Sequence, residues 1–540
     1  MLPPAGNYDD LQRNFLWCVP EFYNIGIDIC DRHADGTGHL ALLFLDDARR
    51  CVRYTFDELK NLSNRFANVL AADGLARGDR MGVLLPQSPE TGIAHIAAFK
   101  SALISIPLFM LFGEEALEFR LANSGAKAII TDANGLAKIA AIRNRLPDLG
   151  RIYVVGADLP DTGQDGVVSF SAAIERASDR FVPAATRADD PALIIYTSGT
   201  TGNPKGALHP HRTLLGHLPG VELSHDFLPQ PGDLIWTPAD WSWIGGLIDV
   251  LFPAWHHGVP VVASRARKFD PDAAMALMAE HNVRNVFLPP TALKLMRQAR
   301  VRHPGVRLRT IASGGESLGE ELLGWGQDTF GLTINEFYGQ TECNMVLSND
   351  ARLFPVRPGS MGRAVPGHDV RIIDDEGAEL PRGEVGMVGI RRPDPVMFLG
   401  YWQDEAATRQ KFAGDFLRTG DLAFQDQDGY FMFVGRADDL ITSGGYRIGP
   451  GEIENCLIKH PAIVVAAVVG VPDPIRTEAI KAWIVLKEGY TPSDALALEI
   501  RDFVRVRLAA HEYPRHVVFT DALPLTVTGK IIRRELRSRG

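Results

Sequence analysis

This sequence has few cysteines, no excess of basic charge and no long uninterrupted apolar run. Its 540 residues include five cysteines, which are scattered and form no CxxC pair, so neither a disulfide framework nor a zinc site is indicated. The formal net charge of −10 at pH 7 provides no basic field for nucleic acid. The amino terminus has no basic segment followed by an apolar run, so no signal peptide is predicted. These absences favour a reducing, cytoplasmic location.

The longest apolar stretch, residues 93–113, is interrupted by Lys100 and Pro107. It therefore predicts a buried helix followed by a strand rather than a membrane span. Hydrophobic residues make up 46% of the chain and charged residues 23%, which is typical of globular proteins. A chain of this length predicts two or more domains.

Short apolar runs alternate with helical spacing through the first four hundred residues. Because parallel sheets are covered by helices, this alternation predicts an α/β fold of mainly parallel sheets, with ligand loops at the carboxyl ends of the strands. The expected strands lie at residues 80–86, 127–131, 151–155, 192–198 and 285–290.

The pattern changes near residue 360, where short alternating strands with DEG and PRGE turns predict a small antiparallel sheet or barrel-like part. From about residue 438 a compact α+β pattern follows. Its helix begins near residue 494 with Ser493 as N-cap, and Leu496, Ile500, Phe503 and Leu508 lie near one face. We therefore predict an N-terminal domain over residues 1–437 and a small C-terminal domain over 438–540.

Residues 196–206, YTSGTTGNPKG, follow a predicted strand and combine glycines, hydroxyls and Lys205. Glycines let backbone N–H groups approach an anion, and a lysine adds a point charge for phosphate. The nucleotide motif GxxxxGK[ST] does not match, because Pro204 replaces its second glycine and Gly206 its Ser/Thr. The stretch predicts a phosphate loop of another kind, with a plain polar turn as the alternative.

The loop is followed, in order, by SGGESLGEEL (313–322), FYGQTE (337–342), RTGDLAFQDQDGYFMFVGRADDLI (418–441) and LPLTVTGKIIRREL (523–536). Together these segments resemble the signature motifs of the acyl-adenylate-forming (AMP-binding) superfamily, and the resemblance covers nearly the whole chain. SGGYRIGPGEIEN, PGSMGRAVPG and EYPRHVVF are most similar to medium-chain acyl-CoA synthetases.

The resemblance implies an acid–thiol ligase that uses ATP, Mg²⁺ and coenzyme A. A carboxylic acid and ATP give acyl-AMP and pyrophosphate, and coenzyme A then gives acyl-CoA and AMP. The closest alternative is a stand-alone adenylation enzyme that loads a carrier protein in trans. A nucleotide sensor without catalysis is a further alternative from another class.

The resemblance also implies the residues of the ATP site. Tyr338 stacks on adenine, Thr341 contacts the α-phosphate, Glu342 holds Mg²⁺, and Lys530 stabilises the charge that develops during adenylation. Lys530, Thr341 and Glu342 are the implied catalytic residues. The implied ATP-binding residues are Thr197, Ser198, Gly199, Thr200, Thr201, Gly202, Lys205, Gly315, Glu316, Ser317, Glu336, Phe337, Tyr338, Gly339, Gln340, Thr341, Asp421, Arg436 and Lys530.

Lys530 belongs to the predicted small domain, so the site is expected to assemble by domain closure. The resemblance implies that this domain rotates about a hinge at Asp438 to a second pose for thioester formation. The implied coenzyme A residues are Gly444, Gly445, Tyr446, Arg447, Arg476 and Tyr513. Gly444 departs from the serine expected in animal medium-chain enzymes, which leaves a backbone contact there.

The acyl pocket is predicted between residues 236–255 and FYGQTE, with Trp243, Gly245 and Gly339 as candidates. A core helix with ordinary packing aromatics is an equally weighted alternative for 236–255. Acetate-activating relatives carry tryptophan where Gly339 stands, so a medium-chain fatty or aryl-alkyl acid is expected. A homodimer, and a lysine acetyltransferase or deacetylase acting on Lys530, are further expected partners; nucleic acid is not.

Overall fold

The computed structural model describes residues 1–156, 166–197, 204–265, 269–443, 446–474, 477–508, 513–526 and 530–539. By its internal contacts the chain divides into two compact units. The first contains Met1–Pro358, Gly362–Asp369 and Arg392–Lys411, and the second contains Gly359–Met361, Val370–Arg391 and Phe412–Gly540. The predicted boundary at residues 437/438 marks where the C-terminal domain is expected to rotate. A division by internal contacts does not test a rotation, so this boundary stays a prediction.

One sheet of the first unit has the strand order β19-β9-β8-β4-β3-β5-β6-β7 in the described residues. The strands from β8 to β7 pair in parallel, whereas β9 and β19 extend the sheet antiparallel. The strands are β3 (Arg80–Leu84), β4 (Ile104–Pro107), β5 (Ala128–Asp132), β6 (Arg151–Val155), β7 (Val167–Ser169), β8 (Pro191–Thr197), β9 (Lys205–Pro210) and β19 (Gly400–Tyr401).

The second sheet of this unit has the order β16-β15-β14-β13-β12-β10-β11-β1-β2 and is parallel from β14 to β1. Its strands are β1 (Leu40–Leu45), β2 (Cys51–Thr55), β10 (Ile235–Trp236), β11 (Val261–Ser264), β12 (Asn285–Phe287), β13 (Thr310–Gly314), β14 (Ile334–Gln340), β15 (Cys343–Ser348) and β16 (Arg363–Ala364). All five strands expected from the sequence are present, and the prediction of mainly parallel sheets is confirmed.

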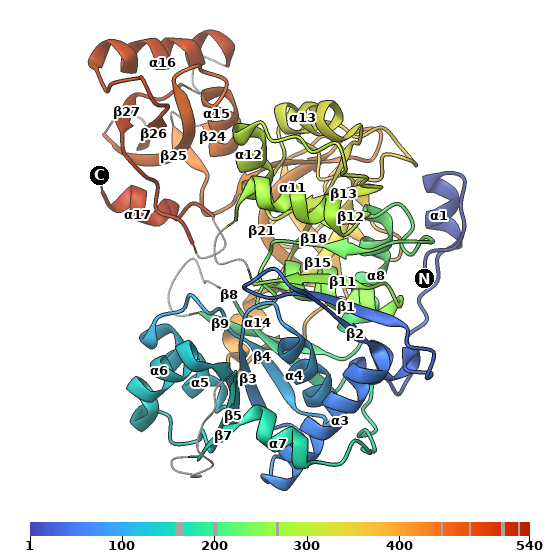
Figure 1. Ribbon diagram of the computed structural model, residues 1–540. Coiled ribbons are helices and arrows are strands. Elements are labelled where there is room, and N and C mark those ends of the chain that lie inside the picture. Colours follow the sequence, from blue (N-terminus) through green and yellow to red (C-terminus); the bar gives the residue numbers. More distant parts are fainter. Residues whose placement is uncertain are drawn as a thin grey trace. The chain divides into compact units, whose positions relative to one another are not determined.

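Helices cover these sheets, as Figure 1 shows for α3, α4 and α7. Helix α4 (Pro89–Lys100) begins where the Ser88 hydroxyl accepts the Thr91 N–H, and β4 follows it, as predicted for the apolar stretch. No described helix is long and apolar enough to cross a membrane. The other helices of this unit are α1 (Tyr8–Asn14), α2 (Ile25–Asp28), α3 (Phe56–Ala72), α5 (Glu114–Ser124), α6 (Ala133–Ile142), α7 (Phe170–Arg176), α8 (Thr213–Ser224), α9 (Ile244–Gly246), α10 (Phe252–His256), α11 (Pro271–Glu280), α12 (Pro290–Ala299), α13 (Glu320–Phe330) and α14 (Glu405–Gln410).

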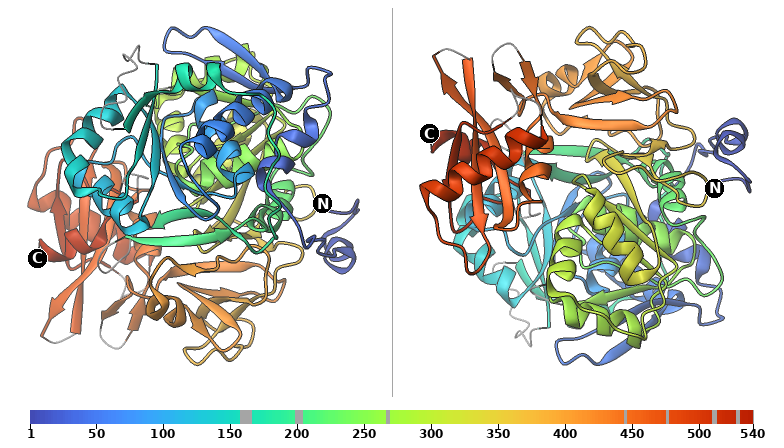
Figure 2. Two further views of the ribbon diagram at one scale, coloured as in Figure 1. Left: turned by 90° about the horizontal axis from the view of Figure 1, so that it is seen from below. Right: turned by 90° about the horizontal axis from the view of Figure 1, so that it is seen from above.

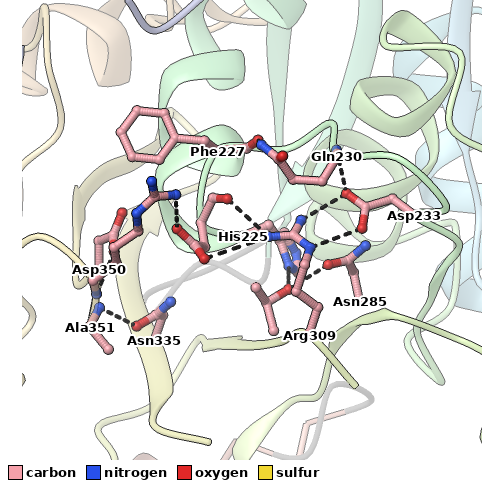
Figure 3. Close-up of polar contacts among 12 residues, drawn as sticks. His225, Phe227, Gln230, Asp233, Asn285, Arg309, Asn335, Asp350 and Ala351 are labelled. Carbon is pink, nitrogen blue, oxygen red and sulfur yellow. Dashed lines mark hydrogen bonds and ion pairs between the residues drawn. The ribbon is translucent and has the colours of Figure 1, made fainter. Parts of the chain in front are cut away.

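A polar network ties the amino ends of the second sheet's strands to the segment after α8 (Figure 3). Arg309 donates two hydrogen bonds to Asp233, at 3.0 and 2.7 Å. The Thr310 hydroxyl donates to the Asn285 side chain at 2.7 Å and lies 2.8 Å from His225 Nδ1. These bonds hold the amino ends of the strands in place, and the ligand loops of such folds lie at the opposite, carboxyl ends.

The second unit contains two antiparallel-rich sheets, as the change of pattern after residue 360 predicts. The first has the order β17-β18-β21-β20, with β22 paired to β21, and the second has β24-β23-β26-β25, with β27 paired to β26. The strands are β17 (Val370–Ile373), β18 (Gly386–Arg391), β20 (Phe412–Ala413), β21 (Phe416–Gln425), β22 (Phe431–Arg436), β23 (Ile441–Ser443), β24 (Tyr446–Ile448), β25 (Ile463–Asp473), β26 (Thr477–Leu486) and β27 (His516–Phe519).

Alternating residues of β25 and β26 build two small cores. Val468 and Ile480 pack with α15 (Pro450–Leu457) and α16 (Asp494–Arg507), whereas Val469 and Trp483 pack with α17 (Arg533–Ser538). Figure 1 labels the three helices around these strands, and Figure 2 draws the same part of the chain in orange to red. The Ser493 hydroxyl accepts the Leu496 N–H, which confirms the predicted N-cap of α16.

Candidate active site

The predicted phosphate loop joins the antiparallel strands β8 and β9. Ser198, Gly199, Thr200, Thr201 and Gly202 lie outside the described residues. Its two flanks are described: Thr197 faces Lys205 across the hairpin, and the Thr197 hydroxyl donates to the Lys205 carbonyl at 3.4 Å. Because β8 runs parallel to β4, the loop leaves the carboxyl end of the sheet, where ligands bind in such folds.

Tyr401, a residue that the sequence did not indicate, contacts both Lys205 and the predicted metal ligand Glu342. The Lys205 ammonium lies 5.3 Å from the centre of the Tyr401 ring, a cation–π distance. The Tyr401 hydroxyl donates to the Glu342 carboxylate. Burial and the neighbouring Glu342 carboxylate raise the pKa of Tyr401, so it stays a hydrogen-bond donor.

Lys411 is a second residue that the sequence did not indicate. Its ammonium lies 3.7 Å from Glu342 Oε1 and donates to the Gln340 side chain at 3.2 Å. Tyr401 lies on β19, which pairs with β9, and Lys411 follows α14, so both come from a segment at least 59 residues beyond FYGQTE. No sequence motif marks them; their only signal is the fold.

Glu342 is buried, with 7% of its surface exposed, and its carboxylate contacts the Lys411 ammonium and the Tyr401 hydroxyl. Among the described residues no group of three or more His, Cys, Asp or Glu side chains could hold a metal by itself. Mg²⁺ is commonly held by one or two carboxylates together with substrate phosphates. A single carboxylate that shares Tyr401 with Lys205, at the flank of the predicted phosphate loop, fits Mg²⁺ delivered with ATP.

The predicted adenine-side residues lie at the carboxyl ends of β13 and β14. Gly315 has a φ of +99°, which favours glycine, and the Glu316 carboxylate accepts from Lys294 at 3.1 Å. Ser317 completes this turn before α13. Glu336 on β14 is buried and accepts the Leu318 N–H at 3.1 Å, so one strand's carboxylate holds the neighbouring strand's loop. Burial raises the pKa of Glu336 to about 8.

FYGQTE forms the end of β14 and its turn into β15. Tyr338, half-buried, faces Leu347 on β15, and the register shifts between Tyr338 and Gln340. A β-carbon on Gly339 would lie 2.4 Å from the Met345 backbone nitrogen, so no side chain fits there without a backbone shift. Thr341 and Glu342 occupy the turn itself. Close approach of two strands is therefore a reason for glycine at 339 that the sequence did not indicate.

The acyl-pocket candidates gather beside this hairpin. Ring centres of Trp243 and Phe287 lie 5.8 Å apart, and those of Phe287 and Phe337 lie 5.4 Å apart. A β-carbon on Gly245 would lie 2.6 Å from the Trp243 ring, so Gly245 leaves room for that ring. Residues 244–256 are helical, with a π-helical segment at Leu247–Leu251. The assignment to an acyl pocket stays a prediction.

Three predicted residues of the second unit, Asp421, Arg436 and Asp438, lie together, because Arg436 contacts the other two. Arg436 on β22 is the register partner of Asp421 on β21, and its guanidinium lies 3.2 Å from the Asp421 carboxylate. The same guanidinium donates to Asp438 at 2.9 Å. The predicted ribose acceptor and the predicted hinge residue therefore share one arginine.

Lys530 also belongs to this unit and is exposed, with its backbone N–H donating to the Thr526 hydroxyl at 3.0 Å. Tyr513 packs beside α16 and lies under the Arg515 guanidinium, 3.9 Å from its carbon to the ring centre. Gly444, Gly445 and Arg476 lie outside the described residues. Tyr446 and Arg447 lie on β24, where only the backbone is described.

Comparisons with known proteins agree with this arrangement. The AMP-binding enzyme family model matches residues 30–402, and the AMP-binding enzyme C-terminal domain model matches residues 452–530. The chain is 35% identical to acetyl-coenzyme A synthetase of Bacillus subtilis (strain 168), over 98% of this chain and 95% of that one. It is 36% identical to human acyl-coenzyme A synthetase ACSM4, mitochondrial, over 96% and 91%.

Among solved structures, the anthranilate CoA ligase AuaEII in complex with anthranoyl-AMP resembles the chain with a TM-score of 0.86 and 31% identity, covering 96% of this chain and 98% of that one. The chain belongs to the AMP-binding enzyme family. It is an AMP-forming acyl-CoA synthetase, an acid–thiol ligase whose substrates are ATP, coenzyme A and a carboxylic acid.

Proposed function

We propose that the acid is a medium-chain fatty or aryl-alkyl acid. The support is the aromatic row of Trp243, Phe287 and Phe337, together with Gly339, where the resemblance implies that acetate-activating relatives carry tryptophan. The segment 236–255 contains no lysine or arginine to pair with a second carboxylate. Apolar, aromatic surroundings of the predicted acyl pocket favour an uncharged acyl chain.

In the first step, the acid's carboxylate oxygen forms a bond to the α-phosphorus of ATP, and the bond to the leaving pyrophosphate breaks. Lys205 and the loop 198–203 hold the phosphates, and Thr341 donates to the α-phosphate. The observation that supports this assignment is the Lys205–Tyr401–Glu342–Lys411 cluster, in which Tyr401 contacts both the Lys205 ammonium and the Glu342 carboxylate. Bound Mg²⁺ would neutralise phosphate charge there, held by Glu342.

Lys530 supplies the positive charge that stabilises the adenylation transition state. We infer that residues 438–540 rotate about Asp438 to bring it to the ATP site. A second pose then lets coenzyme A's sulfur bond to the acyl carbon as AMP leaves. Gly444, Gly445, Tyr446, Arg447, Arg476 and Tyr513 would lie along the coenzyme A path. The glycines allow the thiol a close approach.

A substrate panel tests the choice of acid. Pyrophosphate release is measured with acetate, butyrate, octanoate and benzoate, each at several concentrations, with and without coenzyme A. We expect the highest kcat/KM for octanoate or an aryl acid. The relatives include an acetyl-coenzyme A synthetase, so acetate is the second candidate; acetate as the clear favourite would reject the proposal.

We further propose a cytoplasmic location, a homodimer, and control by acetylation of Lys530, which is exposed. Acetylation would remove the charge that adenylation needs. Mass spectrometry of Lys530 together with activity after enzymatic acetylation tests this. Unchanged pyrophosphate release from fully acetylated protein would reject it, and light scattering tests the dimer.

A further inference from the structure

A buried amide–carboxylate pair lies behind the turn that carries Thr341 and Glu342. Asn344, the second residue of β15, donates through Nδ2 to both carboxylate oxygens of Asp249, at 2.7 and 2.8 Å. Asp249 comes from the π-helical segment Leu247–Leu251, and both side chains are buried. π-Helical turns are uncommon and frequently accompany functional sites.

In the described part of the chain, no lysine or arginine forms an ion pair with Asp249. A histidine, His217, has its Nε2 atom 3.9 Å from Asp249 Oδ1, beyond hydrogen-bond reach. His217 Nδ1 donates to the Thr213 carbonyl at 2.7 Å, and burial lowers the pKa of His217 to about 4, so its ring is neutral. A buried acid without a cation is costly unless hydrogen bonds compensate, and Asn344 provides them.

The Asn344 side chain also lies against Gly339, on the strand opposite its own. A β-carbon on Gly339 would lie 2.4 Å from Asn344 Oδ1, so the amide lies between Asp249 on one side and Gly339 on the other. Met345, the next residue, has a φ of +54°, a conformation that needs support from its surroundings. Displacing the Asn344 amide would therefore move the strand that begins directly after Glu342.

We propose that Asp249 is a positioning residue of the adenylation step: through Asn344 it fixes the turn that presents Thr341 and Glu342 to ATP and Mg²⁺. The inference depends on the proposed roles of these two residues. Groups that orient a metal ligand indirectly cost about 10–100-fold in metal affinity or activity when removed. Asn344 lies outside the motifs that the sequence singled out, and Asp249, although it lies in the segment 236–255, was not a candidate there.

A swap of the two side chains tests the link. Asp249→Asn leaves two amides face to face, and Asn344→Asp leaves two acids. The double variant Asp249→Asn/Asn344→Asp restores an amide donating to a carboxylate with the roles exchanged. For each, acid-dependent ATP–pyrophosphate exchange is measured against Mg²⁺, giving kcat, KM for ATP and the apparent Mg²⁺ constant.

We expect each single variant to lose about 10–100-fold in kcat or Mg²⁺ affinity, and the double variant to recover most of the loss. Asn285→Asp is the matched control: it also alters a buried amide, one bonded to Thr310 away from the turn, and should lower the thermal midpoint without changing Mg²⁺ dependence. Single variants with unchanged Mg²⁺ dependence, or a double variant as poor as the singles, would overturn the inference.

If the swap does not fold, Asn344→Ser keeps a hydroxyl donor toward Asp249 in a smaller side chain. A partial loss of Mg²⁺ affinity is then expected, and an unchanged Mg²⁺ constant overturns the inference. Failure of the proposed function is distinguishable, because the unaltered enzyme would then show no acid-dependent exchange at all. Failure of the inference leaves that exchange intact and insensitive to the Asp249–Asn344 pair.

Discussion

Replacing Glu336 by glutamine should change how stability depends on pH. Glu336 is buried on β14, and its carboxylate accepts one N–H, from Leu318. Burial raises its pKa from 4.5 to about 8 in the folded protein. The folded state therefore keeps a proton that the unfolded state releases above pH 4.5. The stability this provides is complete below pH 4.5 and is lost as pH rises toward about 8.

The magnitude follows from the two pKa values. The interval from 4.5 to about 8 corresponds to roughly 5 kcal/mol in total, of which roughly 2–3 kcal/mol falls between pH 6 and pH 9. Glutamine keeps the acceptor for Leu318 and has no proton to lose. We expect the Glu336→Gln variant to gain stability relative to the unaltered protein by that amount between pH 6 and pH 9.

Urea unfolding followed by tryptophan fluorescence measures this. Every tryptophan except Trp483 lies in the first unit, so the signal reports on the unit that contains Glu336. Glu316→Gln is the control, because that carboxylate is partly exposed and bonded to Lys294, and it should leave the pH profile unchanged. A stability difference between Glu336→Gln and unaltered protein that stays constant from pH 6 to pH 9 would refute the reasoning.

Three further changes have defined outcomes. Gly339→Ala places a β-carbon 2.4 Å from the Met345 nitrogen, so overpacking of about 1–3 kcal/mol should lower the thermal midpoint, and an unchanged midpoint would contradict the geometry. Burial raises the pKa of Asp350 to about 6, so stability should fall from pH 4 to pH 6 in unaltered protein but less in Asp350→Asn; parallel urea profiles would exclude this. Lys100, fully buried, lies 2.5 Å from Asp31; Lys100→Met should cost roughly 3–5 kcal/mol by leaving that acid unpaired, measured by calorimetry, and a neutral effect would show that the pair is dispensable.

The strands and helix ends were predicted well from the sequence, because an apolar run or an N-cap is set by residues that are neighbours in the chain. The apolar run at residues 151–155 forms a strand. Ser493, a hydroxyl residue that precedes a helical pattern, caps the helix that follows it, as expected. The glycines and acidic residues of the motifs could also be identified from the sequence, because each motif lies within one short segment of the chain. Asp421 and Arg436 were each named from a motif, whereas their pairing by strand register is a finding of the structure.

Residues brought in by tertiary pairing were not visible. Tyr401 reaches Glu342 only because β19 pairs with β9, and no pattern in LGYWQD marks that strand as part of the site. Asp249 looks like a polar interruption in an apolar helix until the π-helical turn and Asn344 explain it. Gly339 was interpreted by its effect on a ligand, whereas its contact with the neighbouring strand is a property of the folded hairpin.

The central claim is that Lys530 serves adenylation and that a second pose serves thioester formation. The direct measurement compares unaltered protein with Lys530→Ala in two separate half-reactions: octanoate-dependent ATP–pyrophosphate exchange, and octanoyl-CoA formation from synthetic octanoyl-AMP and coenzyme A. The account predicts that Lys530→Ala nearly abolishes the first and retains most of the second. Equal loss of both half-reactions, or loss of neither, would contradict it.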